Sequence, residues 1–217
     1  MLRKISIGRF AGVMYLIVLV FSVSALAIRG NIPLTSDSLD LYMISFILDL
    51  IHMLAYLLLV WALYVYLKHI NQNSALLMVI SVVVAVAIMS LNMLSHYASM
   101  ILISGDTYLQ VFSAEQLNAL ALFFKKLHEN GFLIAQIFFG LWLLPLGYLV
   151  YHSGFIPKLL GSLLMVGAFG YLIDFLIYFL APQLRVISAP GLVIATIAEL
   201  WMIGWLLFKS GRIETYN

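Results

Sequence analysis

The 217-residue chain contains no cysteine, few charged residues and only 5 prolines. Without cysteine it has no disulfide, no thiolate metal site and no cysteine nucleophile. Charged residues make up 9% of the chain, against roughly 25% in soluble domains, so a water-soluble fold could not cover its surface. The net charge of +2 is small and no basic stripe with interleaved aromatic residues is present, so nothing indicates nucleic-acid binding.

The chain is rich in long runs of apolar residues. Hydrophobic residues make up 65% of the chain, and several runs exceed the roughly 18 residues that mark a membrane span. We predict an all-α, polytopic integral membrane protein that forms a single bundle over residues 1–217. The expected spans are residues 10–28, 41–67, 75–103, 131–151, 158–180 and 190–208. The first also resembles a cleavable secretory signal, but it is longer than a usual signal core, so we expect a retained helix.

Local patterns predict where two of these helices begin and end. Ser113 is followed three residues later by Gln116, which is the pattern of a capping box that opens a helix. The amphipathic stretch 114–129 that follows either lies in the membrane interface or forms the projecting start of the fourth span. Gly154 can end a helix in the left-handed conformation, and Pro157 can open the next one without losing a needed N–H.

Basic residues are distributed unequally between the two sides of the expected bundle. The side of the N-terminus has the larger set: Arg3, Lys4, Arg9, Lys68, Lys158, Lys209 and Arg212. The opposite side has Arg29, Lys125, Lys126 and Arg185. The positive-inside rule therefore predicts that both termini are cytoplasmic.

Polar side chains inside the spans are the candidates for a functional site, because charges in hydrocarbon are costly and often functional. Counting about 1.5 Å per residue from the cytoplasmic helix ends places most of them in the outer half of the membrane. We expect Asp49, His52, His128 and Asp174 to face one shared cavity or polar seam. The full candidate polar cluster is Asp49, His52, Asn92, His96, His128, Asp174 and Glu199.

Each candidate also has a structural interpretation. A carboxylate or imidazole inside a span can hydrogen-bond to a neighbouring helix and serve packing alone. Histidine and carboxylate suit zinc or iron, but no two histidines have HExxH spacing, so metal ligands, cofactors and catalytic residues stay unassigned. We expect Gly161, Gly167 and Gly170 to allow close helix packing. Most tyrosines and tryptophans are expected at the membrane interface or facing lipid.

Several segments resemble a known family. The similarity runs through Ala119–His128, is strongest in Ser153–Gly161 and Gly170–Asp174, and extends to Arg9–Gly12 and Leu63–Lys68. These segments resemble a bacterial and archaeal family known only as domain of unknown function number forty-three eighty-six. The resemblance implies six spans with a retained first helix, and no known activity. It further implies a multi-pass protein of a bacterial or archaeal cell membrane, such as the bacterial inner membrane. It also implies polar family positions at Asp49, His128, Asp174 and Glu199, whereas Trp142 and Leu133 stand where members often carry a histidine and a polar residue.

Three classes of function remain open. A non-catalytic membrane protein would use the polar cluster for packing or to bind a lipid or partner. A small proton- or cation-linked transporter would use Asp49, Asp174 and Glu199, although no clear inverted repeat is present. A metal-dependent, membrane-embedded hydrolase ranks last, because no motif supports it. The lipid bilayer is the expected partner and nucleic acid is not; a homo-oligomer and a small-molecule ligand stay open.

Overall fold

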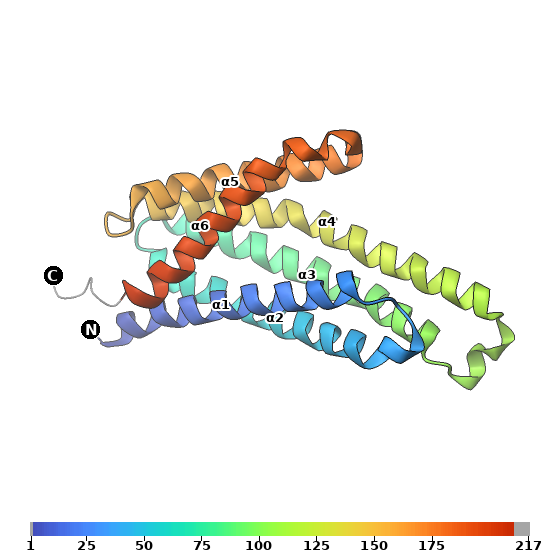
Figure 1. The fold of residues 1–217 in the computed structure, drawn as a ribbon. Coiled ribbons are helices and arrows are strands. Elements are labelled where there is room, and N and C mark those ends of the chain that lie inside the picture. Colours follow the sequence, from blue (N-terminus) through green and yellow to red (C-terminus); the bar gives the residue numbers. More distant parts are fainter. Residues whose placement is uncertain (1, 211–217) are drawn as a thin grey trace.

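The computed structural model describes residues 2–210, with side chains described from residue 7 onward. Six long helices follow one another along the chain (Figure 1): α1 (Leu2–Asn31), α2 (Leu39–Leu67), α3 (Gln72–Ile103), α4 (Ala114–His152), α5 (Lys158–Leu180) and α6 (Ala189–Phe208). The 3-10 helices η1 (Ser36–Ser38), η2 (Thr107–Val111) and η3 (Pro182–Ile187) lie in the loops before α2, α4 and α6. Residues 2–210 contain no β-strand.

The six helices are all long and apolar enough to cross a membrane. This confirms the predicted all-α, polytopic membrane fold. The first helix is longer than the predicted span, since α1 continues through Arg29 to Asn31. Of the basic residues used to predict orientation, Arg212 lies outside the described residues, and Arg3 and Lys4 lie outside the described side chains.

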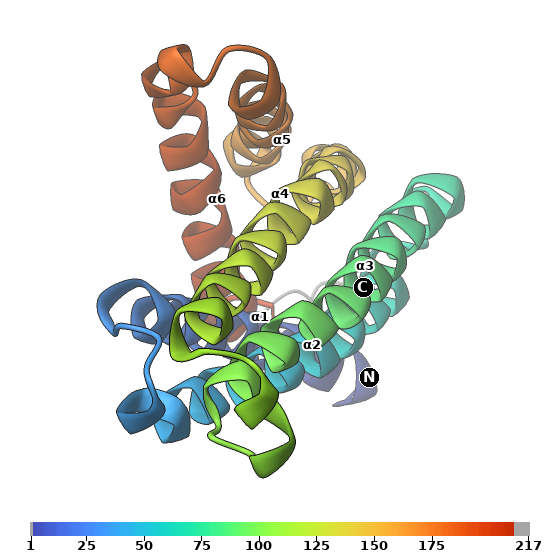
Figure 2. The same ribbon diagram turned by 90° about the vertical axis from the view of Figure 1, so that its right-hand side faces the viewer.

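The helices form an up-and-down bundle in which each helix packs against the next one in sequence, and α6 returns to contact α1. The start of α1 and the end of α6 lie at one end of the bundle, which we call the near end; the opposite end is the far end (Figure 1). Helix α6 lies diagonally across the bundle (Figure 1): it begins beside α5 and crosses α1 at the near end. Viewed from the far end, the far-end parts of α5 and α6 lie apart from α1 and α2 (Figure 2), whereas the near-end part of α6 contacts α1.

The longest helix, α4, extends beyond the others at the far end (Figure 1). Its 39 residues span about 58 Å, roughly twice the thickness of the hydrocarbon core. The predicted capping box is confirmed: Ser113 Oγ accepts from Gln116 N–H at 3.2 Å, and Gln116 Oε1 accepts from Ser113 N–H at 2.9 Å. The amphipathic stretch 114–129 is therefore the projecting start of α4.

Tight turns join the helices at the near end. Gly154, in the turn between α4 and α5, has φ +75°, which confirms the predicted left-handed helix end. Pro157 is the residue directly before α5, as its missing N–H allows. This short connection keeps α4 and α5 side by side, and both helices contribute to the cavity described next.

Candidate functional site

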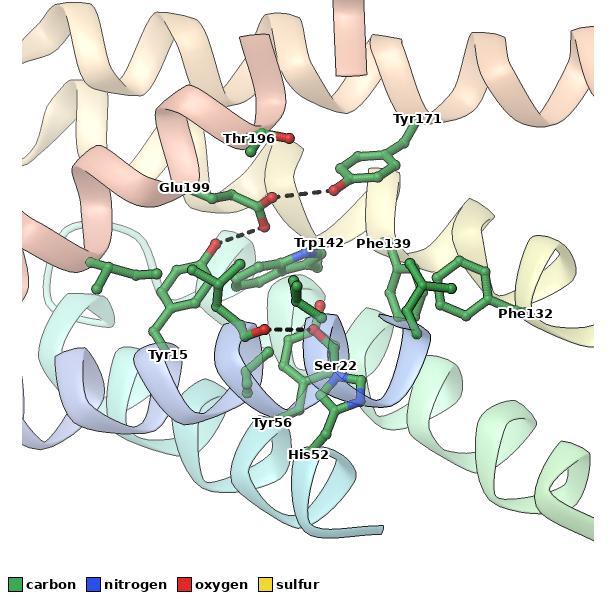
Figure 3. Close-up of a pocket in the computed structure, with 15 residues that line it drawn as sticks. Tyr15, Ser22, His52, Tyr56, Phe132, Phe139, Trp142, Tyr171, Thr196 and Glu199 are labelled. Carbon is green, nitrogen blue, oxygen red and sulfur yellow. Dashed lines mark hydrogen bonds between the residues drawn. The ribbon is translucent and has the colours of Figure 1, made fainter. Parts of the chain in front are cut away.

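An apolar cavity of about 370 Å³ lies between α1 and α6, with residues of α2, α4 and α5 closing its inner side (Figure 3). Val23 and Leu26 of α1 lie at its edge and are 55% and 65% exposed. Both belong to a helix that is apolar enough to cross the membrane. The cavity therefore opens sideways, onto the surface that faces lipid.

Glu199 is the acidic residue that lines this cavity (Figure 3). Its two carboxyl oxygens accept hydrogen bonds from Tyr15 of α1, at 2.8 Å, and from Tyr171 of α5, at 3.2 Å. Among the described residues, no lysine, arginine or histidine lies within 4.0 Å of the carboxylate. Within the described part of the chain, Glu199 therefore has two neutral hydrogen-bond donors and no counter-ion.

Aromatic rings form the inner wall of the cavity (Figure 3). Trp142 of α4 is 2% exposed, and its ring centroid lies 5.7 Å from Tyr15 and 5.3 Å from Tyr56. His52 lines the same cavity, stacks on Tyr56 at 6.1 Å, and leaves its buried Nδ1 without a hydrogen-bond partner. Trp142 therefore packs between two tyrosine rings in this wall.

The expectation that tyrosines and tryptophans face lipid or the interface is wrong for these residues. Tyr15, Tyr56 and Trp142 are at most 5% exposed. An aromatic ring buries a large apolar area, and a buried hydroxyl needs a partner, which Glu199 gives Tyr15. The position of Tyr15 in the sequence could have indicated its burial, because Tyr15 lies inside a span and far from either interface.

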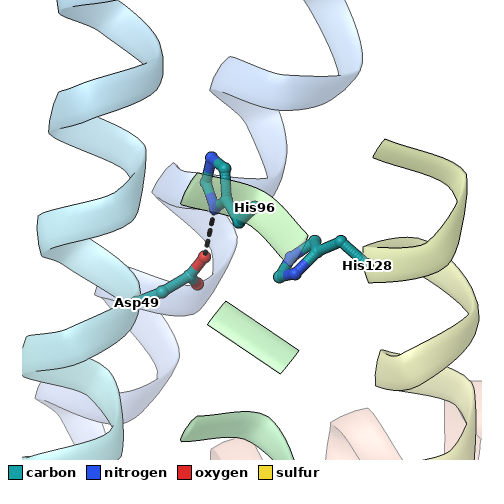
Figure 4. Close-up of side chains that lie close together, drawn as sticks. All are labelled: Asp49, His96 and His128. Atoms are coloured by element: carbon teal, nitrogen blue, oxygen red, sulfur yellow. Dashed lines mark ion pairs between the residues drawn. The ribbon is translucent and has the colours of Figure 1, made fainter. Parts of the chain in front are cut away.

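A second polar group joins α2, α3 and α4 (Figure 4). It lies toward the far end, because Asp49 is in the first half of α2 and His96 is near the end of α3. Asp49, His96 and His128 are 3%, 2% and 5% exposed, and each offers a ligand atom within 4.8 Å of the others. Asn92 of α3 contacts His128 twice. The side-chain amide of Asn92 donates to the main-chain carbonyl of His128 at 2.8 Å, and the main-chain carbonyl oxygen of Asn92 lies 3.3 Å from His128 Nδ1. Four of the predicted candidates therefore come together here.

Arg29 is the member of this second group that the sequence interpretation missed. Its guanidinium donates to Asp49 Oδ2 and forms an ion pair with it. The predicted first span, residues 10–28, ended just before Arg29 and left that residue outside the helix. The helix continues for another turn, and the guanidinium thereby reaches α2.

Asp174 belongs to a third group, in which it holds the turn before α6. Ser188 Oγ donates to Asp174 Oδ1 at 2.5 Å, and Gln136 Nε2 of α4 donates to Oδ2 at 2.9 Å. Arg185 lies 3.7 Å from Oδ1, with a side chain that is 53% exposed. These contacts join α4, α5 and the start of α6, so they give Asp174 a packing role.

The candidates thus fall into three groups and not into the one seam that we expected. No described contact joins Asp174 to Asp49 or His128. Depth along the membrane was the reason for grouping them, but depth leaves the rotation of each helix undetermined. Asp174 faces Gln136 and Ser188, whereas His52, one turn after Asp49, faces the cavity.

Comparison with known proteins identifies relatives but no activity. A family model described as "Domain of unknown function (DUF4386)" matches residues 10–210. An uncharacterized protein of the archaeon Archaeoglobus fulgidus is 35% identical over 83 residues, which cover 37% of this chain. The match spans about half of that relative, 47% of its length. No solved structure matches the chain.

Proposed function

We propose that this chain, which belongs to the family described as a domain of unknown function (DUF4386), binds a lipophilic cation in the Glu199 cavity. The ligand would be an apolar molecule with a positively charged or protonatable nitrogen. The observation that carries the proposal is a carboxylate without a counter-ion, facing an aromatic-walled cavity that opens toward lipid.

Charge balance is the first argument. A carboxylate taken out of water is stable only if it is protonated or paired with a cation. Tyr15 and Tyr171 give Glu199 two hydrogen bonds but no charge. A bound cation would supply that charge, and its release would leave Glu199 to take up a proton. This exchange is also the elementary step of a proton-linked transporter, so binding is the first property to test.

The wall of the cavity is the second argument. The faces of aromatic rings attract cations, by about 0.5–2 kcal/mol for each well-placed ring. Tyr15, Tyr56 and Trp142 contribute rings beside Glu199 (Figure 3). The remaining surface is mostly apolar and suits the hydrocarbon part of such a ligand. Since the cavity opens toward lipid, the ligand would enter from the bilayer.

Tetraphenylphosphonium and tetraphenylborate test the proposal, because they share one shape and carry opposite charges. Their binding is measured by calorimetry on the purified chain in lipid nanodiscs, with empty nanodiscs subtracted. We expect saturable binding of the phosphonium only, and Glu199→Gln should weaken it at least about tenfold, since the charge that pairs with the cation in the apolar cavity is lost.

The matched control is Glu115→Gln, which neutralises an exposed glutamate at the start of α4 and should leave binding unchanged. Equal binding of the two ions would show that charge does not direct recognition. Unchanged phosphonium binding by Glu199→Gln would equally contradict the proposal.

We also propose that the near end faces the cytoplasm of a bacterial or archaeal cell. Lys68, Lys158 and Lys209 follow or begin helices at that end. Reporter fusions after Ile70 and after His152 should therefore report cytoplasm, and fusions within residues 29–40 should report the outside. An external signal after His152 would reverse this orientation.

A further inference from the structure

We propose that Asp49, His96 and His128 bind one divalent transition-metal ion, zinc or iron, toward the far end of the bundle. The three residues come from α2, α3 and α4, and their ligand atoms lie within 4.8 Å of one another (Figure 4). The proposal goes beyond binding in the Glu199 cavity and uses none of the residues on which that binding rests.

An unpartnered nitrogen is the observation that points to an ion. His96 is 2% exposed, and its Nδ1 has no hydrogen-bond partner among residues 2–210. Leaving a buried polar atom unsatisfied costs about 1–3 kcal/mol, so such an atom calls for a cause. Asp49 Oδ2 lies 4.0 Å from this nitrogen, which is too far for a hydrogen bond. A cation between the two atoms would satisfy both.

The other nitrogen of each imidazole has a partner of the kind that metal ligands use. His96 Nε2 lies 3.5 Å from Ser45 Oγ, and His128 Nδ1 lies 3.3 Å from the carbonyl oxygen of Asn92. A metal-bound histidine usually donates its second N–H to a carbonyl, hydroxyl or carboxylate, which fixes the ring and its tautomer. In that arrangement His96 Nδ1 and His128 Nε2 keep their lone pairs for the ion.

Asn92 holds His128 in place because α3 and α4 pack closely at Gly131. A Cβ built on Gly131 would overlap the Asn92 side chain, so glycine leaves the space that the amide fills. The amide also donates to the His128 carbonyl, which fixes α4 against α3. Asn92 is therefore a positioning residue for the metal site and not a ligand.

The ligand chemistry sets the class of metal. Two imidazoles and one carboxylate suit zinc, or iron in a site with open positions. Zinc ligands lie about 2.0–2.2 Å from the ion, so atoms 4.8 Å apart must approach by roughly 1–1.5 Å. Side-chain rotation can provide this change without moving the helices. Three protein ligands leave at least one position open for water or another ligand.

Arg29 competes with the metal for Asp49. Its guanidinium is paired with the same carboxylate oxygen that faces His96. Two cations at one carboxylate repel each other, so metal binding requires Arg29 to move away. Its side chain is 15% exposed and lies in the last turn of α1, where it can turn toward the far end. Removal of the guanidinium should therefore strengthen metal binding.

The test uses the purified full-length chain in detergent, stripped with a chelator and titrated with Co²⁺ and then with Zn²⁺. We expect about one metal ion per chain by elemental analysis, and cobalt absorption bands that zinc removes. His96→Gln and His128→Gln should each weaken binding at least about tenfold, as loss of metal-site groups does. Arg29→Gln should tighten it several-fold. His152→Gln, at the near end of α4, is the matched control and should leave binding unchanged.

Folding of each variant is checked by its elution as a single species and by its helical circular dichroism. Absence of stoichiometric metal in the wild-type chain would overturn the proposal. So would unchanged affinity in folded His96→Gln and His128→Gln, or affinity in Arg29→Gln that is no tighter than in the wild type. Since Glu199 lies outside this site, Glu199→Gln should bind cobalt normally, which separates this result from the test of the cavity.

Discussion

Gly170→Ala should unfold the protein at a clearly lower temperature than the wild type, and Gly170→Leu should lower it further. A Cβ built on Gly170 would overlap the backbone carbonyl carbon of Gly191, and one built on Gly191 would lie 2.6 Å from the Gly170 Cα. Backbone atoms cannot rotate aside as a side chain can, so α5 and α6 would have to separate. Overpacking of this kind costs about 1–3 kcal/mol, and leucine exceeds alanine because it adds more atoms.

Gly204→Ala is the matched control on α6. Apart from the neighbouring backbone of α6, no atom of the described residues lies within 4 Å of a Cβ built on Gly204. Alanine in place of a helical glycine gains about 0.5–1 kcal/mol, because the unfolded chain loses flexibility. Thermal unfolding in one detergent should therefore rank Gly204→Ala at or above the wild type and Gly170→Ala below it. Similar melting temperatures for both variants would contradict the close approach of α5 and α6.

Arg29→Gln should destabilise the metal-free protein by about 3–5 kcal/mol, because it leaves the Asp49 carboxylate buried without its partner. Adding Asp49→Asn should restore most of that loss, since the double variant has no charge to bury. This recovery distinguishes a desolvated ion pair from a general loss of packing. The measurement is chemical or thermal unfolding of both single variants and the double variant.

An exposed ion pair on α4 gives the control for the comparison of the Arg29 and Asp49 variants. Lys126 and Glu129 lie 2.9 Å apart, with side chains 76% and 45% exposed. Such surface pairs contribute about 0–1 kcal/mol, so Lys126→Gln should change stability little. If Arg29→Gln lowers the stability as little as Lys126→Gln does, the Asp49 carboxylate is hydrated and Arg29 and Asp49 do not form a buried ion pair. Zinc should also stabilise Arg29→Gln more than the wild type, since it replaces the lost positive charge.

The sequence predicts the local features of this fold well, because they depend on neighbouring residues. Ser113 and Gln116 form the expected capping box, and Gly154 takes the expected left-handed conformation. The number of helices follows from the length of the apolar runs. These features need only the spacing of a few residues or the average polarity of a segment.

The sites could not be predicted to the same depth, because they depend on how distant helices rotate and tilt. Tyr15 and Glu199 are 184 residues apart and meet only because α6 crosses α1. The contact of His96 with His128 needs the facing sides of α3 and α4. Arg29 was missed for a smaller reason: helix ends are uncertain by a turn, and one turn carries this guanidinium from a loop to Asp49.

We propose that Glu199, which lines the cavity between α1 and α6, exchanges a proton for a lipophilic cation. Dicyclohexylcarbodiimide tests it directly, because this apolar reagent adds to the protonated form of a carboxyl group and leaves a stable acylurea. Mass spectrometry of treated membranes should find the adduct on Glu199 and not on exposed Glu115, and tetraphenylphosphonium should suppress it while tetraphenylborate does not. An unmodified Glu199, or a yield of adduct that the phosphonium leaves unchanged, would contradict this exchange at Glu199.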